Sequence, residues 1–431
     1  EISACLVGSE MCIRDRSFIE GNEIQNVYVT INNGYVTWKE GANAGDFAKK
    51  ALEYANTNKL QFDKKETAPD AAVGETTSTV IFSDLPLGYY LVDSSVGALC
   101  SLNTTATEVN IQEKNGVPSV DKKVQEDSTN AWGDSNTADI GQTVNFKTTI
   151  TAQPGAQKYV LHDKMAEGLT FDGTVTVTKG GTTLVSPIDY SLITDDANIT
   201  DGCTFEIVFT QEFCDTLEAD DQIIVTYSAT LNENAVIAGE GNKNTTKLTY
   251  GDSSETTTST TTTKTYSIPV FKYTGTDTPL ENAKFELKRA GEATAIALIK
   301  KIPVTGTTPT YEGDIYRVAK NGETGTVTEV TTPASGKFKI EGLDADTYYL
   351  TETKQPDGYN KLSTPIKVVI ADNGSITVDN GTSSVTEVKV LNNTGSILPS
   401  TGGSGTTLIY ILGAVLVLGS SVVLITKKRM R

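Results

Sequence analysis

The stretch YLTETKQPDGY, residues 349–359, decides how the C-terminal third of the chain folds. Its first half alternates between the two faces of a strand, and Pro356-Asp357-Gly358 predicts the turn that ends the strand. This alternation places Leu350 and Glu352 on the same face. If Leu350 packs into a core, the carboxyl group of Glu352 is buried with it, and an isolated buried carboxylate is energetically costly. The stretch therefore predicts a β-domain with an acidic side chain in its core.

Two other strands of this region direct polar side chains toward the same core. Lys272 alternates with Val270 in the first strand of the region, and Asn392 alternates with Val390 in the last. Asn393 is the alternative to Asn392, but the alternation favours Asn392. One domain therefore offers an inward lysine, an inward glutamate and an inward asparagine on three strands.

These three side chains suit the formation of an amide bond between two of them. Burial lowers the pKa of an amine and raises that of a carboxylic acid, which favours a neutral amine beside a neutral acid. The amine of Lys272 would attack the side-chain carbonyl of Asn392. Glu352 would hydrogen-bond that carbonyl, stabilise the oxyanion and shuttle protons while ammonia leaves. The expected product is an intramolecular isopeptide bond; the alternative is a salt bridge between Glu352 and a surface lysine.

The rest of the chain is also predicted to be strands separated by turn residues, which indicates an all-β protein of tandem Ig-like β-sandwich domains. One segment differs, because residues 44–60 have helical spacing that places Phe47, Ala51, Leu52 and Ala55 on one face. The predicted strands include residues 27–31, 78–82, 143–150, 174–178, 204–210, 222–231, 246–250, 266–273, 283–289, 336–340, 347–353, 366–370 and 385–391.

These patterns divide the chain into three domains. They are an N-terminal domain over residues 17–117, a middle domain over 118–255 and a C-terminal domain over 264–397. Residues 256–263 are almost all threonine and have nothing with which to build a core, so we expect an extended linker.

Residues 1–16 do not have the positive start and apolar core of a signal peptide. Their second half, EMCIRDR, resembles a translated adapter used in sequencing libraries. We therefore interpret residues 1–16 as a sequencing artefact outside the fold, and expect that the signal peptide and the first strand of the first domain are missing.

The last stretch, residues 398–431, combines a short motif, an apolar run over 408–425 and a basic tail. A helix as long as the apolar run rises about 27 Å, close to the roughly 30 Å of a bilayer core, so it predicts a C-terminal transmembrane helix in the precursor. The basic tail would stay on the cytoplasmic side and the rest of the chain would lie outside the cell. The motif consists of Leu398, Pro399, Ser400, Thr401 and Gly402.

The composition excludes several kinds of partner and site. The formal net charge of −18 argues against nucleic acid or anionic lipid as a partner of the extracellular part. Five cysteines are too few for a disulfide scaffold; Cys203 and Cys214 either pair or remain free thiols. His162, the single histidine, is expected to be a solvated strand residue, because one histidine makes neither a metal site nor a catalytic triad. We expect no metal and no cofactor.

The sequence resembles known surface proteins of Gram-positive bacteria. Residues 398–431 resemble the cell-wall sorting signal that sortase transpeptidases read. Residues 349–359 resemble the E-box of collagen-adhesin B-type domains, residues 279–287 are similar to the segment after their reactive-lysine strand, and residues 392–395 to their terminal asparagine strand. The resemblance implies that Lys272 and Asn392 form an isopeptide bond with Glu352 as the catalytic acid.

The middle domain repeats this pattern with other residues. Alternation points Lys122 inward and Lys123 outward, and Asn244 shares a face with the apolar residues of a later strand. The segment 159–171 supplies Asp163 and looks like the isopeptide-forming fimbrial domain of backbone pilins, in which an aspartate replaces the glutamate. The predicted trio is Lys122, Asp163 and Asn244, with Asn242 and Lys123 as the alternatives.

One more lysine lies at the junction of the first two domains. Residues 109–115, VNIQEKN, resemble the pilin motif YPKN of backbone subunits, although Gln112 and Glu113 stand where the motif has Tyr and Pro. The resemblance implies that Lys114 is the acceptor amine for the next subunit. The alternative is a solvated lysine in a turn.

Taken together, the resemblance predicts a backbone subunit of a sortase-assembled Gram-positive pilus, a structural protein rather than an enzyme. Its partners would be other copies of itself, the pilus and housekeeping sortases, and peptidoglycan, and the mature protein would be anchored to the cell wall. The alternative is a monomeric wall-anchored adhesin or ancillary pilin that binds a host ligand. A wall-anchored hydrolase would need a catalytic constellation for which the sequence offers no motif.

Overall fold

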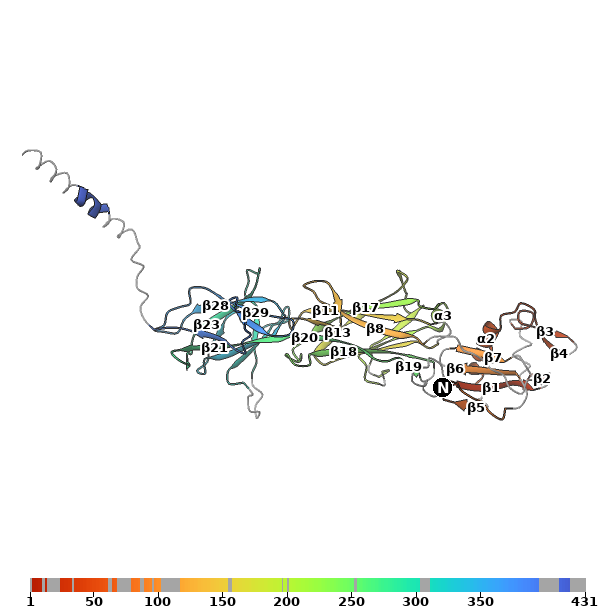
Figure 1. Cartoon of the computed structure of the whole chain (residues 1–431). Coiled ribbons are helices and arrows are strands. Elements are labelled where there is room, and N and C mark those ends of the chain that lie inside the picture. Colours follow the sequence, from red (N-terminus) through yellow and green to blue (C-terminus); the bar gives the residue numbers. More distant parts are fainter. Residues whose placement is uncertain are drawn as a thin grey trace, which may run out of the picture.

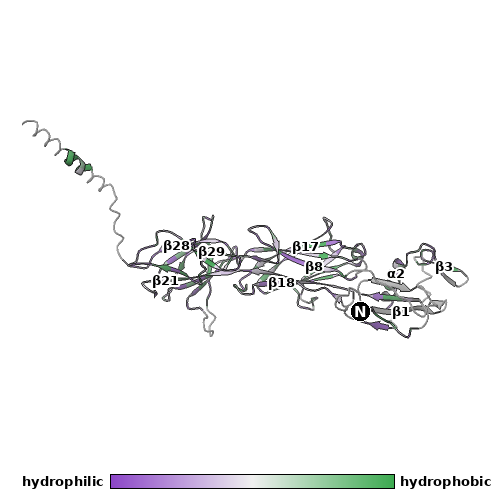
Figure 2. Cartoon of the chain, in the orientation of Figure 1, coloured by the Kyte–Doolittle hydropathy of each residue, from purple (hydrophilic) through white to green (hydrophobic). Residues whose placement is uncertain are grey.

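Strands with one buried and one exposed face dominate the computed structural model, as in β17 (Gln222–Leu231), where buried and less buried residues alternate along the whole strand. Three β-rich units follow one another along the long axis of the molecule (Figure 1). Figure 2 shows apolar and polar segments mixed along the sheets of each unit. The prediction of an all-β protein with tandem domains is confirmed. The structure describes residues 2–9, 12–13, 24–32, 35–60, 64–67, 79–85, 89–94, 97–101, 117–153, 157–195, 197–199, 201–251, 254–302, 311–394 and 411–418.

The first unit contains a sheet with the strand order β2-β1-β6-β7, in which β5 also pairs with β1. A separate hairpin is formed by β3 and β4. The strands are β1 (Ile2–Ser9), β2 (Cys12–Ile13), β3 (Val29–Asn32), β4 (Tyr35–Trp38), β5 (Lys64–Glu66), β6 (Tyr89–Ser94) and β7 (Gly97–Ser101).

Part of the segment 1–16 belongs to this sheet. Ile2–Ser9 is β1, which pairs antiparallel with β6 and with β5. The expectation that residues 1–16 stand outside the fold is therefore wrong for β1 and β2, and the origin of the segment stays a prediction. β1 is paired on both sides, with β6 on one and with β2 and β5 on the other, and such pairing uses backbone groups that every residue carries.

The helix predicted from apolar spacing is α2 (Ala44–Thr57). Its buried face consists of Phe47, Ala48, Ala51, Leu52 and Ala55. The side chain of Asn43 caps the helix by accepting from the backbone N–H of Gly45 at 2.8 Å. The periodicity therefore predicted both the helix and the face that packs against the sheet.

The middle unit is a sandwich of two sheets. One has the order β10-β20-β18-β12-β16-β15, with β19 paired to β18, and the other has the order β14-β13-β17-β11-β8-β9. A short helix, α3 (Gln211–Cys214), follows β16. The remaining strands are β8 (Ser119–Gln125), β9 (Trp132–Gly133), β10 (Ser135–Thr137), β11 (Thr143–Thr151), β12 (Val160–Met165), β13 (Leu169–Lys179), β14 (Thr182–Thr183), β15 (Tyr190–Ile193), β16 (Phe205–Phe209), β18 (Asn242–Tyr250), β19 (Ser254–Glu255) and β20 (Ser259–Lys264).

The threonine-rich segment 256–263 is not the linker that its composition predicted. Most of it is strand β20, which pairs antiparallel with β18 and parallel with β10. Thr261 and Thr263 are fully buried. The prediction is wrong because a strand need not supply a core of its own: β-branched threonine fits a pleated surface, and its methyl group packs against a core that other strands provide.

The C-terminal unit is a second sandwich. One sheet has the order β22-β21-β27-β25-β24, with β31 paired to β21, and the other has the order β26-β23-β28-β29-β30. The strands are β21 (Tyr266–Thr274), β22 (Thr278–Pro279), β23 (Lys284–Arg289), β24 (Leu298–Lys300), β25 (Asp314–Val318), β26 (Val330–Thr331), β27 (Lys337–Leu343), β28 (Thr347–Lys354), β29 (Ile366–Ile370), β30 (Ile376–Val378) and β31 (Val388–Leu391).

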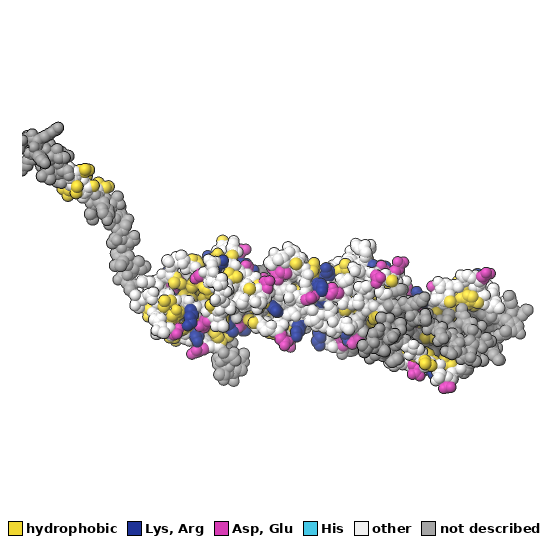
Figure 3. All heavy atoms as spheres, viewed as in Figure 1, with side chains coloured by type: hydrophobic (Ala, Val, Ile, Leu, Met, Phe, Trp, Pro, Cys, Tyr) yellow, Lys and Arg dark blue, Asp and Glu magenta, His cyan; other side chains and the backbone are white. Residues whose placement is uncertain are grey.

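The middle and C-terminal units are in direct contact. The carboxylate of Asp139 accepts from the backbone N–H of Asp344 at 2.7 Å and forms an ion pair with Arg289. The backbone N–H of Ile140 donates to the carbonyl of Gly342 at 3.0 Å. Gly342 has φ +80°, and a Cβ atom there would lie 2.5 Å from Ile140 Cδ1, so the close approach requires glycine. On the face seen in Figure 3, acidic and basic side chains are interspersed over both units.

Beyond the sandwiches, the structure describes residues 411–418, which are helical and have exposed apolar side chains. Among the residues described, no helix combines the length and the apolar character needed to cross a membrane. The predicted transmembrane run over 408–425 lies for the most part outside the described residues, and so does the whole motif over 398–402.

Candidate functional site

The C-terminal sandwich brings its three predicted polar residues together in its core. Lys272 lies on β21, Glu352 on β28 and Asn392 directly after β31, and all three side chains are buried. The Nζ atom of Lys272 lies 3.2 Å from Glu352 Oε1 and donates to Asn392 Oδ1. Asn392 Nδ2 donates to the same Glu352 oxygen at 2.9 Å. One carboxylate oxygen therefore contacts both the amine and the amide nitrogen.

Strand pairing explains this placement. β21 and β31 run parallel, with Lys272 beside Val390, and the backbone N–H of Asn392 donates to the carbonyl of Tyr273 at 3.0 Å. Glu352 reaches the pair from the opposite sheet. Asn393, the alternative, is exposed. The lysine paired with Glu352 is thus a buried one, not the surface lysine of the alternative interpretation.

The surroundings of Lys272 favour its neutral form. Burial lowers the pKa of the Lys272 amine, and the nearby Glu352 opposes this shift. Glu352 is held in place because its Oε2 accepts from the backbone N–H of Leu362 at 2.7 Å. One expectation is corrected: Glu352 contacts the amide nitrogen of Asn392 and not its carbonyl. An acceptor-only carboxylate binds an N–H group, whereas only the protonated acid can donate to a carbonyl.

The middle sandwich also buries its predicted trio. Lys122 on β8, Asp163 on β12 and Asn244 on β18 have no exposed surface. Lys122 Nζ donates to Asp163 Oδ2 at 2.5 Å. Burial lowers the pKa of Lys122, and Asp163 opposes this shift. Lysine and acid therefore meet as they do in the C-terminal sandwich.

The two alternatives for the middle sandwich are engaged elsewhere. Lys123 points outward and pairs with Asp121 at 3.0 Å and Asp134 at 2.7 Å. The amide of Asn242 bonds to backbone groups of Val236 and Thr263. Neither side chain joins Asp163.

A fourth member of the middle cluster, Tyr227, was not predicted from the sequence. Its hydroxyl donates to Asp163 Oδ2 at 2.5 Å, accepts from Lys122 Nζ, and accepts from Asn244 Nδ2 at 3.2 Å. Burial, followed by the charge of Asp163, raises the pKa of Tyr227 well above its usual value. Alternation along β17 was the available signal, because Tyr227 occupies an inward position between Val225 and Ala229.

Two oxygens of the middle cluster have no hydrogen-bond partner among the described residues: Asp163 Oδ1 and Asn244 Oδ1. Buried oxygens without partners are rare and costly. They are the free carboxylate oxygen and the carbonyl oxygen on which negative charge would develop during attack on Asn244. Asp163 Oδ1 and Asn244 Oδ1 can therefore still accept hydrogen bonds, and both are atoms that an amide-forming reaction would use.

Replacing Tyr227 by phenylalanine is expected to slow bond formation in the middle sandwich. The change removes the hydroxyl that orients Asp163 and Asn244, and leaving buried polar groups unpaired costs about 1–3 kcal/mol. If that cost falls on the transition state, the rate drops about 10- to 100-fold. Intact mass measured over time after synthesis would show a slower second loss of ammonia. Tyr159→Phe, another buried tyrosine of this sandwich, is the control, and unchanged kinetics in Tyr227→Phe would restrict Tyr227 to packing.

The other predicted residues are not part of these clusters. Lys114 and the motif over 398–402 lie outside the described residues. Cys203 and Cys214 are free thiols. The prediction of a solvated His162 is wrong, because only 13% of its side chain is exposed and carboxylates of Asp201 and Glu206 face its Nδ1.

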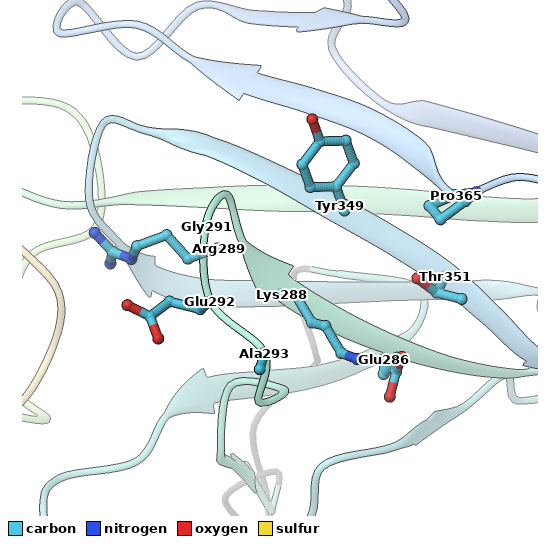
Figure 4. A pocket seen from close by; sticks show the side chains of 9 residues that line it. All are labelled: Glu286, Lys288, Arg289, Gly291, Glu292, Ala293, Tyr349, Thr351 and Pro365. Atoms are coloured by element: carbon cyan, nitrogen blue, oxygen red, sulfur yellow. Dashed lines mark ion pairs between the residues drawn. The ribbon is translucent and has the colours of Figure 1, made fainter.

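A shallow hollow lies on the outer face of the C-terminal sandwich, over β23 and β28 (Figure 4). Within the hollow Glu286 and Lys288 form an ion pair at 3.2 Å. The side chain of Arg289 points away from this ion pair (Figure 4). The hollow shares no residue with the buried cluster. Its lining consists of Glu286, Lys288, Arg289, Gly291, Glu292, Ala293, Tyr349, Thr351 and Pro365.

Comparisons with known proteins agree with this architecture. The family model described as Gram-positive pilin backbone subunit 2, Cna-B-like domain, matches residues 140–254. The SpaA model, described as a prealbumin-like fold domain, matches residues 267–382.

One curated relative is similar over a short part of the chain. Fimbrial subunit type 1 of Actinomyces viscosus is 36% identical over 96 residues, which are 22% of this chain and 17% of that protein. The aligned part thus spans less than a fifth of the relative's length.

Two solved pilin structures are also similar. The 35 kDa C-terminal fragment of the major pilin GBS80 of Streptococcus agalactiae is 22% identical, with a TM-score of 0.48, over 64% of this chain and 100% of that one. The group B streptococcus pilus 2b backbone protein is 25% identical, with a TM-score of 0.46, over 65% and 99%. By these models, the middle sandwich matches a Gram-positive pilin backbone domain, and the C-terminal sandwich that follows it matches a prealbumin-like fold domain.

Proposed function

We propose that the chain is the backbone subunit of a covalently polymerised pilus and that autocatalytic isopeptide bonds lock its two sandwiches. The observation that carries this proposal is the pair of fully buried lysine–acid–asparagine clusters, one in each pilin domain. Burying ionisable groups without a use is costly. The subunit is a structural protein that modifies itself once and does not turn over.

In the C-terminal cluster, the neutral amine of Lys272 attacks Cγ of Asn392. The bond from Cγ to Nδ2 breaks as the bond from Nζ to Cγ forms, so the products are one secondary amide and one ammonia. Glu352 Oε1, which contacts both nitrogens, takes the proton from Nζ and returns it to the departing Nδ2.

The middle cluster performs the same reaction with other groups. Asp163 takes the proton from Lys122, and the Tyr227 hydroxyl lies between this acid and the Asn244 amide. Tyr227 accepts from both Lys122 and Asn244, so its hydroxyl holds the amide near the amine that attacks it. The product is a Lys122–Asn244 bond with release of a second ammonia.

Polymerisation uses the two segments outside the sandwiches. A pilus sortase cleaves between Thr401 and Gly402 and holds Thr401 as a thioester, and the amine of Lys114 on another subunit resolves it. A housekeeping sortase finally joins the fibre to peptidoglycan. The apolar run and basic tail keep the precursor at the membrane until cleavage, and the mature subunit lies on the surface of a Gram-positive cell.

The experiment that tests this role replaces Lys114 by arginine in cells that express the partner sortase. Boiled gels should show a ladder of high-molecular-weight species for the wild-type chain and none for Lys114→Arg, since a guanidinium is not a nucleophile at neutral pH. Lys123→Arg is the control, because this nearby lysine is partly exposed and engaged in ion pairs. An unchanged ladder in Lys114→Arg would remove Lys114 from the mechanism. A wild-type chain without any ladder would favour a monomeric adhesin or ancillary pilin that binds a host ligand.

A further inference from the structure

A second group of reactive side chains lies on the other side of strand β12 from Asp163. It consists of His162 on β12, Asp201 and Cys203 in the segment before β16, and Glu206 on β16. One ligand atom each from His162, Asp201 and Cys203 lie within 4.8 Å of one another. Glu206 Oε1 lies 3.1 Å from His162 Nδ1. None of these residues takes part in the two amide-forming clusters.

The distances suit a single small cation. His162 Nδ1 lies 3.0 Å from Asp201 Oδ2, and Cys203 Sγ lies 3.0 Å from the same oxygen. A tetrahedral zinc ion with bonds of about 2.0–2.3 Å separates its ligand atoms by roughly 3.3–3.7 Å. The 3.0 Å separations of Asp201 Oδ2 from His162 Nδ1 and from Cys203 Sγ are shorter than these values by only a few tenths of an ångström.

The imidazole of His162 is oriented as a ligand would be. Its Nε2 is hydrogen-bonded to Thr249 Oγ1 at 3.0 Å. Its buried Nδ1 makes no well-aligned hydrogen bond among the described residues and faces carboxylate oxygens of Asp201 and Glu206 at 3.0 and 3.1 Å. When Nε2 carries the proton and donates it to Thr249, Nδ1 presents a lone pair to two carboxylates. Metal-ligating histidines hold the other ring nitrogen in this way, and a cation between Nδ1 and the carboxylates relieves their repulsion.

We propose that His162, Asp201 and Cys203, with the Glu206 carboxylate beside His162, form a binding site for a divalent transition-metal ion of the zinc type. Imidazole and thiolate ligands favour zinc over calcium and magnesium, which prefer oxygen ligands only. The ion joins β12, β16 and the segment between them. Because β12 also carries Asp163, and the backbone N–H of Thr204 donates to the Asp163 carbonyl at 2.7 Å, the ion stabilises the strand that holds the catalytic acid.

The test uses the tag-free full chain, stripped of metal with a chelator and dialysed against zinc alone. The wild-type chain is expected to bind one equivalent and to unfold at a higher temperature when zinc is present. Cobalt in place of zinc should give the visible absorption spectrum of a tetrahedrally coordinated ion and a charge-transfer band from the thiolate. This spectrum needs no variant and therefore remains informative if a variant fails to fold.

Variants locate the ion. Cys203→Ser and His162→Gln should abolish stoichiometric binding and the thiolate band, while Cys214→Ala, which removes a free thiol outside the group, should retain both. Thr249→Val, which removes only the partner of Nε2, should weaken binding about 10- to 100-fold. No saturable zinc binding by the wild-type chain, or equal binding by Cys203→Ser, would overturn the proposal and leave His162 as the ion-paired neighbour of two carboxylates.

Discussion

Replacing Glu352 by glutamine should return one ammonia to the intact mass of the chain. The wild-type chain is expected to weigh two ammonia molecules less than its sequence, one for each cluster, and Glu352→Gln only one. Glutamine has nearly the shape of glutamate and can still accept from Leu362, so packing is retained. It cannot take a proton from Lys272 and pass it to Asn392, so the amide does not form.

The same variant should lose much of the stability of the C-terminal sandwich. Lys272 and Asn392 are 120 residues apart, and a covalent link across such a loop contributes near 4–5 kcal/mol in the chain-entropy treatment of disulfides. Denaturant unfolding of the C-terminal sandwich would therefore shift to a markedly lower midpoint, while the middle sandwich keeps its own bond.

Glu341→Gln provides the matched control. Glu341 is also a buried glutamate of this sandwich, but it pairs with Lys301 at 3.1 Å and Lys339 at 2.6 Å. The Glu341→Gln chain should still show an intact mass that falls short by two ammonia molecules. A Glu352→Gln chain that still lost two ammonia molecules would exclude Glu352 as the acid, and a full sequence mass for the wild-type chain would falsify both isopeptide bonds.

The second large effect concerns Asp344, at the contact between the two sandwiches. Burial, together with the charges of Asp139 and Asp127, raises the pKa of Asp344 to about 7, although hydrogen bonds from the Thr137 side chain and from the backbone N–H of Ala345 oppose this shift. An aspartate in an unfolded chain titrates near pH 3.9. The folded state thus binds the proton more tightly, so its stabilisation is complete below about pH 4 and is lost as the pH rises through 7. The two pKa values differ by about three units, which corresponds to a loss of at most roughly 4 kcal/mol in the free energy of unfolding.

Asp344→Asn should remove this dependence, because the amide resembles the protonated acid at every pH. Unfolding curves and amide hydrogen exchange at Ile140 and Asp344 would be compared between pH 4 and 8. Asp346→Asn, a neighbour with a more exposed carboxylate that pairs with Arg289, is the control for a general charge effect. A wild-type contact that was equally stable across this range would contradict the expectation.

Local alternation predicted the buried trios because the period of a strand depends only on neighbouring residues. It separated Lys122 from Lys123 and Asn392 from Asn393, and the structure places the first of each pair inside. No such local rule identifies which inward residues of distant strands meet. Tyr227 lies 64 residues from Asp163, so its hydroxyl joined the cluster through tertiary packing alone.

The lack of a rule for contacts between distant segments also explains why the predictions for residues 256–263 and for His162 were wrong. The threonines of β20 looked unable to form a core because the sequence does not show that β18 and β10 flank them. His162 does occupy an outward position on β12, as alternation requires, but the segment around Asp201 folds over it. In each case a distant segment supplied the burial.

The parallel pairing of β21 with β31 also decides how the chain transmits tension along a fibre. If both proposed isopeptide bonds form, and neighbouring subunits pull on Lys114 and on Thr401, the covalent path would run from 114 to 122 and cross to 244. It would then continue through β18, β20 and β21 to 272 and cross to 392. Residues 123–243 and 273–391 then lie off this path and bear no tension. Most of each sandwich, including its surface loops, is free to vary in sequence without changing how far the fibre can stretch.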